Sequence, residues 1–188
     1  MDFFYSNEMI LCSLIALSVI AIFDEIYFHQ YKSKLLKRVE SNLENYLHLM
    51  RSFVFSLIFI LVSAFSFSGS WATFVLGLFL FDIFVSIGDI LVERRSRKSI
   101  GGLSTGEYLT HMLLSFHLGV LYLNLIPKLI QNVSKKTDIY LKSIGFLNST
   151  LIVLGVLTLI YSAFQFFYLL KKRNVTYNDE KNRGFYGQ

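Results

Sequence analysis

The sequence predicts an all-α integral membrane protein: a helical bundle with about five transmembrane helices, four of which enclose a polar site. Hydrophobic residues make up 54% of the 188 residues and the mean hydropathy is +0.51, which is too apolar for an ordinary soluble domain of this size. Several apolar runs approach or exceed the ~18 residues that suggest a membrane-spanning helix. One proline and eleven glycines leave few helix breakers, so long helices are expected.

The expected spans cover residues 9–30, 40–67, 72–93, 105–126 and 144–170, in a single transmembrane domain of residues 1–173. Gly101 and Gly102 permit a tight turn before the fourth span, and Ser104-x-x-Glu107 fits a capping box that opens it. Pro127 is expected to end that helix. A polar loop, with or without a helical segment, would cover residues 128–142. Residues 174–188 are expected to form a flexible polar cytoplasmic tail.

Basic residues follow the first span, the third span and the fifth span, and this distribution predicts the orientation. The positive-inside rule places the N-terminus outside and the C-terminus in the cytoplasm of an inner or plasma membrane, although the loop of residues 128–142 is an exception with four lysines. The net charge of +5 is therefore attributed to topology, and no nucleic-acid partner is expected. The single Cys12 excludes an intrachain disulfide and a cysteine-based zinc site.

Three of the expected helices pair a glutamate with a histidine four residues later, which places both side chains on one helix face. A fourth helix ends in two carboxylates, and the topology brings all four sets to the cytoplasmic end of the bundle. Because such groups are costly near hydrocarbon unless they are paired or ligated, we expect a polyvalent metal site there. The predicted ligand pool is Glu25, His29, Glu44, His48, Asp89, Glu93, Glu107 and His111.

Four further residues are expected to orient a ligand or to contact a substrate, namely Arg51, Asp82, Arg94 and His117. Arg51 shares the helix stripe of Glu44 and His48, so it can orient a carboxylate or contact a lipid phosphate. Asp82 lies about 10 Å deeper than Asp89 by helix rise and is suited to substrate binding, proton relay or pairing with an arginine.

Other polar residues are expected to lie outside the ligand set. His117 is turned about 120° from the Glu107–His111 face, which favours a hydrogen bond between helices. Asp24 points away from the Glu25–His29 face of a regular α-helix, which places it behind the ligands or at the surface. The basic group of Arg94, Arg95, Arg97 and Lys98 is also explained as a topology determinant that favours anionic lipid.

Oxygen and nitrogen ligands without a thiolate suit iron, manganese or zinc. Several carboxylates and three histidines favour a two-metal centre, with two iron ions as the first expectation and zinc or manganese as alternatives. The spacing of four residues departs from the Glu-x-x-His motif of ferritin-like di-iron bundles. The histidine clusters of membrane desaturases and hydroxylases are missing too, so membership of neither class follows.

The first functional hypothesis is a di-iron membrane oxidoreductase that acts on a lipid or another hydrophobic molecule at the cytoplasmic leaflet, with an electron donor as partner. A zinc-dependent lipid hydrolase would use the same layout to activate water. A membrane metal-ion transporter or metal-binding protein is a further alternative, although the outer halves of the spans carry little charge. A metal-free Glu/His/Arg network in a structural or signalling protein also remains open, as does a capping role alone for Glu107.

Overall fold

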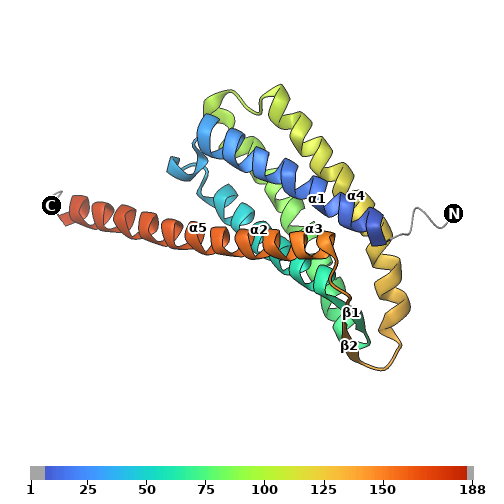
Figure 1. Ribbon diagram of the computed structural model, residues 1–188. Coiled ribbons are helices and arrows are strands. Elements are labelled where there is room, and N and C mark those ends of the chain that lie inside the picture. The colour runs from blue at the N-terminus through green and yellow to red at the C-terminus, as the bar shows by residue number, and fades with distance from the viewer. Residues whose placement is uncertain (1–6, 186–188) are drawn as a thin grey trace.

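The computed structural model describes the backbone of residues 7–185 and the side chains of residues 9–173. Five long helices dominate the chain, which confirms the predicted all-α fold (Figure 1). They are α1 (Asn7–Phe23), α2 (Asn42–Ala64), α3 (Ser70–Ser96), α4 (Thr105–Val133) and α5 (Phe146–Phe185). A π-helical segment, η2 (Asp24–Lys32), continues α1, and short 3-10 turns cover η3 (Leu35–Lys37) and η4 (Lys98–Ile100).

Five segments are long and apolar enough to cross a membrane, and they are therefore candidate spans. They are Met9–Lys32, Asn42–Ala64, Ser70–Ser96, Thr105–Val133 and Phe146–Arg173. Large apolar side chains cover the outside of these helices; Phe84 is 70% exposed, Leu91 72% and Leu123 73%. Contiguous apolar surface is unfavourable in water and expected against lipid, so the surface supports an integral membrane protein.

Helix α2 packs along α5 and against α3, while α1 lies along α4 (Figure 1). The apolar core between them includes Leu14, Ile58, Val75 and Phe79, which are fully buried. Gly155 brings α5 close to α2, because a Cβ atom there would lie 2.8 Å from Cγ1 of Ile60. A larger residue at this position would push the two helices apart.

A two-stranded antiparallel ladder closes one end of the bundle. Strand β1 (Phe65–Ser68) pairs with β2 (Asp138–Leu141), so that Phe65 lies opposite Leu141. Gly69 follows β1 with φ of 58°, and a Cβ atom there would collide with Thr137. Glycine is therefore required where the ladder turns into α3. The opposite end of the bundle contains η2, the start of α2, the end of α3 and the start of α4.

Several boundaries differ from those expected. Pro127 lies inside α4, which continues to Val133, because Leu125 and Leu129 on either side are buried in the core and hold the helix in place. The predicted loop of residues 128–142 therefore contains the end of α4 and the strand β2, and α2 ends at Ala64 because β1 pairs with that strand.

Helix α5 also extends further than expected. It continues past Arg173 to Phe185, into the segment predicted to be a flexible tail. Residues 186–188 of that segment lie outside the described residues.

Candidate metal centre

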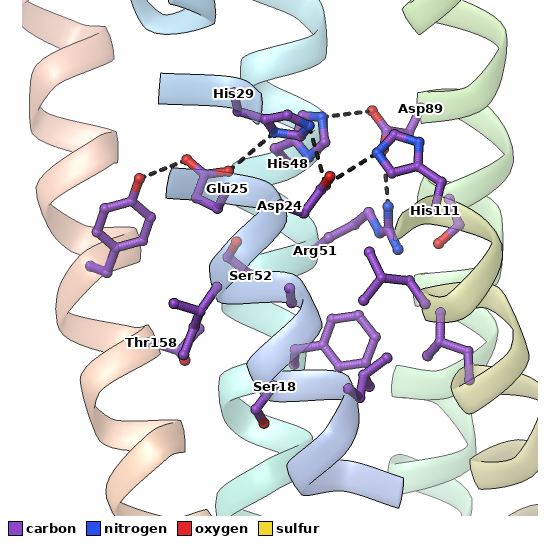
Figure 2. A pocket seen from close by; sticks show the side chains of 18 of the residues that line it. Ser18, Asp24, Glu25, His29, His48, Arg51, Ser52, Asp89, His111 and Thr158 are labelled. Atoms are coloured by element: carbon purple, nitrogen blue, oxygen red, sulfur yellow. Dashed lines mark hydrogen bonds and ion pairs between the residues drawn. The ribbon is translucent and has the colours of Figure 1, made fainter. Parts of the chain in front are cut away.

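The ends of four helices bring all eight predicted ligands into one buried polar layer. The three histidines lie close together: the ring centroids of His29 and His48 are 4.4 Å apart, and those of His29 and His111 are 6.1 Å apart. Carboxylates surround them from η2, α2, α3 and α4. Figure 2 shows Asp24, Glu25 and Asp89 among them. The predicted convergence at a common level is therefore present in the structure.

The π-helical segment η2 places two adjacent carboxylates beside one histidine. In a π-helix the backbone hydrogen bonds join residues five apart, so residues five apart become neighbours. Asp24 Oδ2 lies 3.3 Å from His29 Nε2, and Glu25 Oε2 lies 3.3 Å from His29 Nδ1. Asp24 is only 4% exposed and does not lie at the surface, which corrects the position expected from α-helical periodicity.

Asp24 also joins η2 to α4. Its Oδ1 accepts a hydrogen bond of 2.7 Å from the Thr110 hydroxyl, and its Oδ2 lies 3.1 Å from Nε2 of His111. The other nitrogen of His111, Nδ1, lies 3.6 Å from Oε1 of Glu93. Asp24, His111 and Glu93 therefore form a chain of potential ligands across three elements (Figure 2 labels Asp24 and His111).

Glu25 is held in place by three donors on one of its oxygens. Its Oε1 accepts hydrogen bonds from Tyr161 at 2.6 Å, Gln30 at 2.7 Å and Gln165 at 2.8 Å. Tyr161 and Gln165 belong to α5, which the sequence analysis left out of the site. Because Oε1 is fully used, the remaining oxygen Oε2 is directed towards His29 and is free to bind a cation.

Arg97 forms a second centre in the same layer. Its guanidinium is fully buried, and it donates to Glu44 Oε1 at 2.9 Å and to Glu107 Oε1 at 2.5 Å. The Ser96 hydroxyl donates to the other oxygen of Glu44. Burial by itself lowers the pKa of a guanidinium, but the hydrogen bonds and charges of Glu44 and Glu107 outweigh it and raise the pKa of Arg97. Arg97 is therefore a permanent counter-ion.

Glu107 belongs to the helix cap and also reaches into the polar layer. Its backbone N–H donates to the Ser104 hydroxyl at the start of α4, so the residue belongs to the helix cap. Its side chain is 1% exposed and reaches into the polar layer, where Oε1 lies 3.7 Å from Nε2 of His29. The capping role alone therefore does not describe Glu107.

Arg51 links the layer to a deeper carboxylate. Its Nη1 donates to Asp89 Oδ2 at 3.0 Å, and its Nε lies 3.9 Å from Oδ1 of Asp82. Asp82 is fully buried and also accepts a hydrogen bond from the Tyr122 hydroxyl. Arg51 therefore orients the carboxylate of Asp89, as its position on the α2 stripe predicted.

Two predicted residues lie apart from the cluster. Arg94 is exposed, and the arginine that reaches the carboxylates is Arg97, three residues later. His117 packs edge-on against Phe116, and its buried Nδ1 has no hydrogen-bond partner among the described residues. A hydrogen bond from this nitrogen to a neighbouring helix is therefore not observed within that part of the chain.

Several ligand atoms are buried without a hydrogen bond to any described residue. They are Nε2 of His29, Nε2 of His48, Oδ1 of Asp89 and Oε1 of Glu93. Buried polar atoms are rarely left in this state, so these four point to an ion or a water that completes the site. His48 Nε2 lies 3.5 Å from Asp89 Oδ1, a contact that suits two ligands of one cation.

The separations between ligand atoms fit a metal centre. Ligand atoms lie about 2.0–2.2 Å from a bound transition metal, so neighbouring ligand atoms of one ion are roughly 2.8–3.6 Å apart. Contacts of 3.1 to 3.6 Å join Asp24 to His111, Glu25 to His29 and Glu93 to His111. Within the described residues, three groups can hold an ion: Asp24/His29/His111, Glu25/His29/His48 and Glu93/Glu107/His111.

The charge of the layer also favours a bound cation. Two arginines, Arg51 and Arg97, face seven carboxylates, which leaves an excess of five negative charges if all seven are ionised and the three histidines are neutral. Clustered buried carboxylates repel one another strongly unless cations or protons compensate them. The carboxylates are Asp24, Glu25, Glu44, Asp82, Asp89, Glu93 and Glu107.

A cavity of about 390 Å³ opens from the layer into the bundle, and all five helices line it. At one end are Glu25, His29, His48 and His111, and at the other are apolar side chains such as Phe59 and Leu118 (Figure 2 shows the polar end). This volume is within the range of small-molecule sites. The histidines therefore face a space that a substrate can enter.

Each site residue that the sequence did not predict was missed for an identifiable reason. Asp24 reaches the site because of the π turn, and the spacing rules for α-helices do not describe such a turn. Arg97 was hidden in a basic run that topology already explained, although its position four residues after Glu93 placed it on the same face. Tyr161 and Gln165 share one face of α5 at a spacing of four, and this pair of polar residues in an apolar helix was an available signal.

Comparisons of the chain with protein-family models, curated proteins and solved structures gave no match. The function of the chain is therefore inferred from the chemistry of the site itself.

Proposed function

We propose that this protein is an integral-membrane metalloenzyme with a two-metal centre, and that it oxidises a lipid or another hydrophobic molecule. The observation that carries the proposal is the set of buried nitrogen and oxygen atoms of His29, His48, Asp89 and Glu93 that have no hydrogen bond to a described residue. These atoms belong to a layer that opens into a largely apolar cavity. A structural network would be expected to satisfy its own buried groups.

The ligands divide between two ion positions. The first would be held by Glu25, His29 and His48, with Asp89 beside His48. The second would be held by Asp24 and by Nε2 of His111, which lie 3.1 Å apart. Glu93 contacts the other ring nitrogen, Nδ1, and would orient the ring of His111. Two divalent cations would reduce the excess of negative charge to about one unit. Oxygen and nitrogen ligands suit iron, which is the metal we propose, and they also suit zinc or manganese.

An iron pair would supply the site at which O₂ is activated. Oxidation of a hydrocarbon by O₂ removes two electrons from the substrate, and two more from an external donor complete the reduction to water. The proposal therefore includes an electron donor as partner. The chain itself would orient Glu25 through Tyr161 and Gln165, and the apolar walls of the cavity would exclude water from the substrate.

Zinc-dependent hydrolysis of a lipid ester or amide is the second candidate, because the same ligands accept zinc. Metal transport receives less support. Beyond Asp82, the core consists largely of apolar side chains such as Leu14, Val75 and Phe79, each at most 3% exposed, which offer no ligand to a passing ion.

Metal analysis of the full chain, purified in detergent after growth with added iron and zinc, tests the proposal. We expect one to two metal ions per chain, with iron in excess over zinc. Less than about one metal ion per chain would refute the metal centre. Oxygen consumption with a lipid extract and a reductant then tests oxidation, while ester or amide cleavage by zinc-loaded protein would replace it with hydrolysis. Metal flux into vesicles would instead establish transport.

A further inference from the structure

The cavity changes character along its length. Next to the histidines its wall is charged, whereas further along the helices it is formed by apolar side chains from four of the five long helices. These are Leu17 on α1, Phe55 and Phe59 on α2, Leu114 and Leu118 on α4, and Leu154 and Leu157 on α5. A ligand that fits this shape has one polar end and an apolar body.

Three of the five serine and threonine hydroxyl groups that line the cavity are already engaged. Ser18, Ser115 and Thr158 each donate to the backbone carbonyl one helical turn earlier, at 2.7–2.9 Å, whereas the buried hydroxyl of Ser86, three residues before Asp89, has no hydrogen bond to a described residue. A donor already engaged in this way makes little demand on a ligand. The wall beyond the histidines is therefore suited to a hydrocarbon chain.

The length and the level of the cavity match a lipid in the bilayer. Along α2 the lining runs from His48 to Phe59, which is about 16 Å at ~1.5 Å per residue. His48 lies in the second turn of a candidate span, near the level of lipid head groups, and Phe59 lies deeper. A lipid would therefore keep its natural depth, with its polar end beside the ligands and its chain below them.

Exposed side chains on the same lining mark openings towards lipid. Ile22 on α1 is 46% exposed, Ile26 on η2 is 62% exposed, and Leu157 on α5 is 56% exposed. All three also line the cavity. The cavity therefore reaches the outer surface of the candidate spans, where a lipid chain can enter sideways from the membrane.

The volume and the charge restrict the ligand further. At roughly 30 Å³ for each non-hydrogen atom, the share of a water molecule, a cavity of about 390 Å³ holds about 13 such atoms. Four carboxylates, Asp24, Glu25, Asp89 and Glu93, line the polar end against one arginine, Arg51. Without metal ions this end is negative if the carboxylates are ionised and the histidines neutral, so in metal-free protein a carboxylate or phosphate head is disfavoured relative to an uncharged one.

We propose that the cavity binds one unbranched lipid chain with an uncharged polar head, such as a medium-chain alcohol, and holds the head beside His29 and His111. The position of the head rests on the proposed function, because it brings the first carbons to the metal ligands. Binding of the chain is independent of the metal, so the two can be tested separately.

A photoreactive analogue of 1-dodecanol, with a diazirine near the far end of its chain, is the probe, used on the full chain in detergent. We expect labelling of cavity residues such as Phe59 and Leu154, and competition by excess 1-dodecanol. In metal-free protein, dodecanoate should compete at least about tenfold more weakly because of its charge. Labelling confined to lipid-facing residues, or without competition, would overturn the proposal. Equal competition by dodecanoate would overturn the assignment of an uncharged head.

Leu154→Trp supplies a matched test, because it fills the cavity from α5. We expect labelling to fall by at least about tenfold, since overfilling a packed site is costly. The control is Leu123→Trp on the lipid-facing side of α4, where the side chain is 73% exposed, and labelling should be unchanged. Equal labelling of the two variants would contradict the inference. Metal content, measured on the same samples, separates this result from the fate of the metal centre: competed labelling of metal-free protein would support the lipid site and refute only the proposed enzyme.

Discussion

The polar layer contains two regions that are both rich in carboxylates. In one region an arginine pairs with the carboxylates, and in the other several buried polar atoms lack hydrogen bonds. Around Arg97, the carboxylates of Glu44 and Glu107 are engaged by a buried guanidinium at 2.5–2.9 Å. Around His29, the nearest polar atoms lie at 3.3 Å, and the nitrogen Nε2 has no hydrogen bond to any residue in the described part of the chain. The first region carries its own cation, and the second has none of its own.

The difference teaches how one cluster can serve both folding and chemistry. A charge that is fully paired holds helices together but offers nothing to a ligand, whereas an unpaired buried group is costly until something binds it. We therefore assign the Arg97 region to the structure of the bundle and the His29 region to cation binding. Glu44 and Glu107, which were predicted as ligands, are therefore assigned a structural role.

The largest expected effect is loss of metal on removal of the central histidine. His29→Ala should lower metal affinity more than 100-fold, because His29 belongs to two of the three ligand groups. His117→Ala is the matched control, since that ring lies apart from the cluster, and it should retain metal. Metal content after dialysis measures both. Retention of metal by His29→Ala would remove the distinction between the two regions.

Arg97→Met should lower the free energy of unfolding of the bundle without removing a proposed ligand. It leaves Glu44 and Glu107 buried without their counter-ion, which typically costs about 3–5 kcal/mol. Arg94→Met, on an exposed side chain of the same helix, should change stability by less than about 0.5 kcal/mol. Chemical unfolding in detergent provides the comparison. Similar stability of the two variants would show that the Arg97 region does not hold the helices together.

Two amide substitutions sharpen the division between the regions. Asp24→Asn should weaken metal binding by more than about tenfold, because the amide is a poorer cation ligand next to His111. Glu107→Gln should instead lower stability by about 1.5–3 kcal/mol, because it loses a charged hydrogen bond to Arg97, and should keep the metal. Calorimetric titration with the metal and unfolding curves measure the two quantities. Loss of metal from Glu107→Gln would return this residue to the ligand set.

The smallest expected effect concerns the support of Glu25. Tyr161→Phe removes one of three donors to Oε1 of Glu25, so metal affinity should fall by about tenfold while the fold persists. Tyr168→Phe, in the same helix but 37% exposed, should leave affinity unchanged. An unaltered affinity in Tyr161→Phe would show that α5 does not position the ligand.

Spacing in the sequence predicted the spans and the convergence of Glu25, His29, Glu44, His48 and the other ligands, because helix periodicity and topology are local properties. It could not predict Asp24, whose approach to His29 depends on a π turn. It could not separate Arg94 from Arg97 either, because only the packed bundle shows which side chain turns inward.

The strands were missed for a related reason. Phe65–Ser68 alternates in sequence, but it and Asp138–Leu141 are only four residues long, and each pairs with the other, which is distant in sequence. Pro127 was taken as a helix end by a local rule, and the burial of Leu125 and Leu129 in the core overrides that rule. Local signals therefore give the elements, while tertiary packing decides their ends.

The fully enclosed guanidinium of Arg97 has a consequence for biogenesis. Chains are made from the N-terminus, so α2 and α3 are complete while the segment with Glu107 is still being synthesised. At that stage Arg97 has Glu44 but lacks its second partner, and a half-paired charge is more stable in water at the membrane surface than among the helices. We therefore infer that the turn between α3 and α4 seals only once the fourth helix has been inserted.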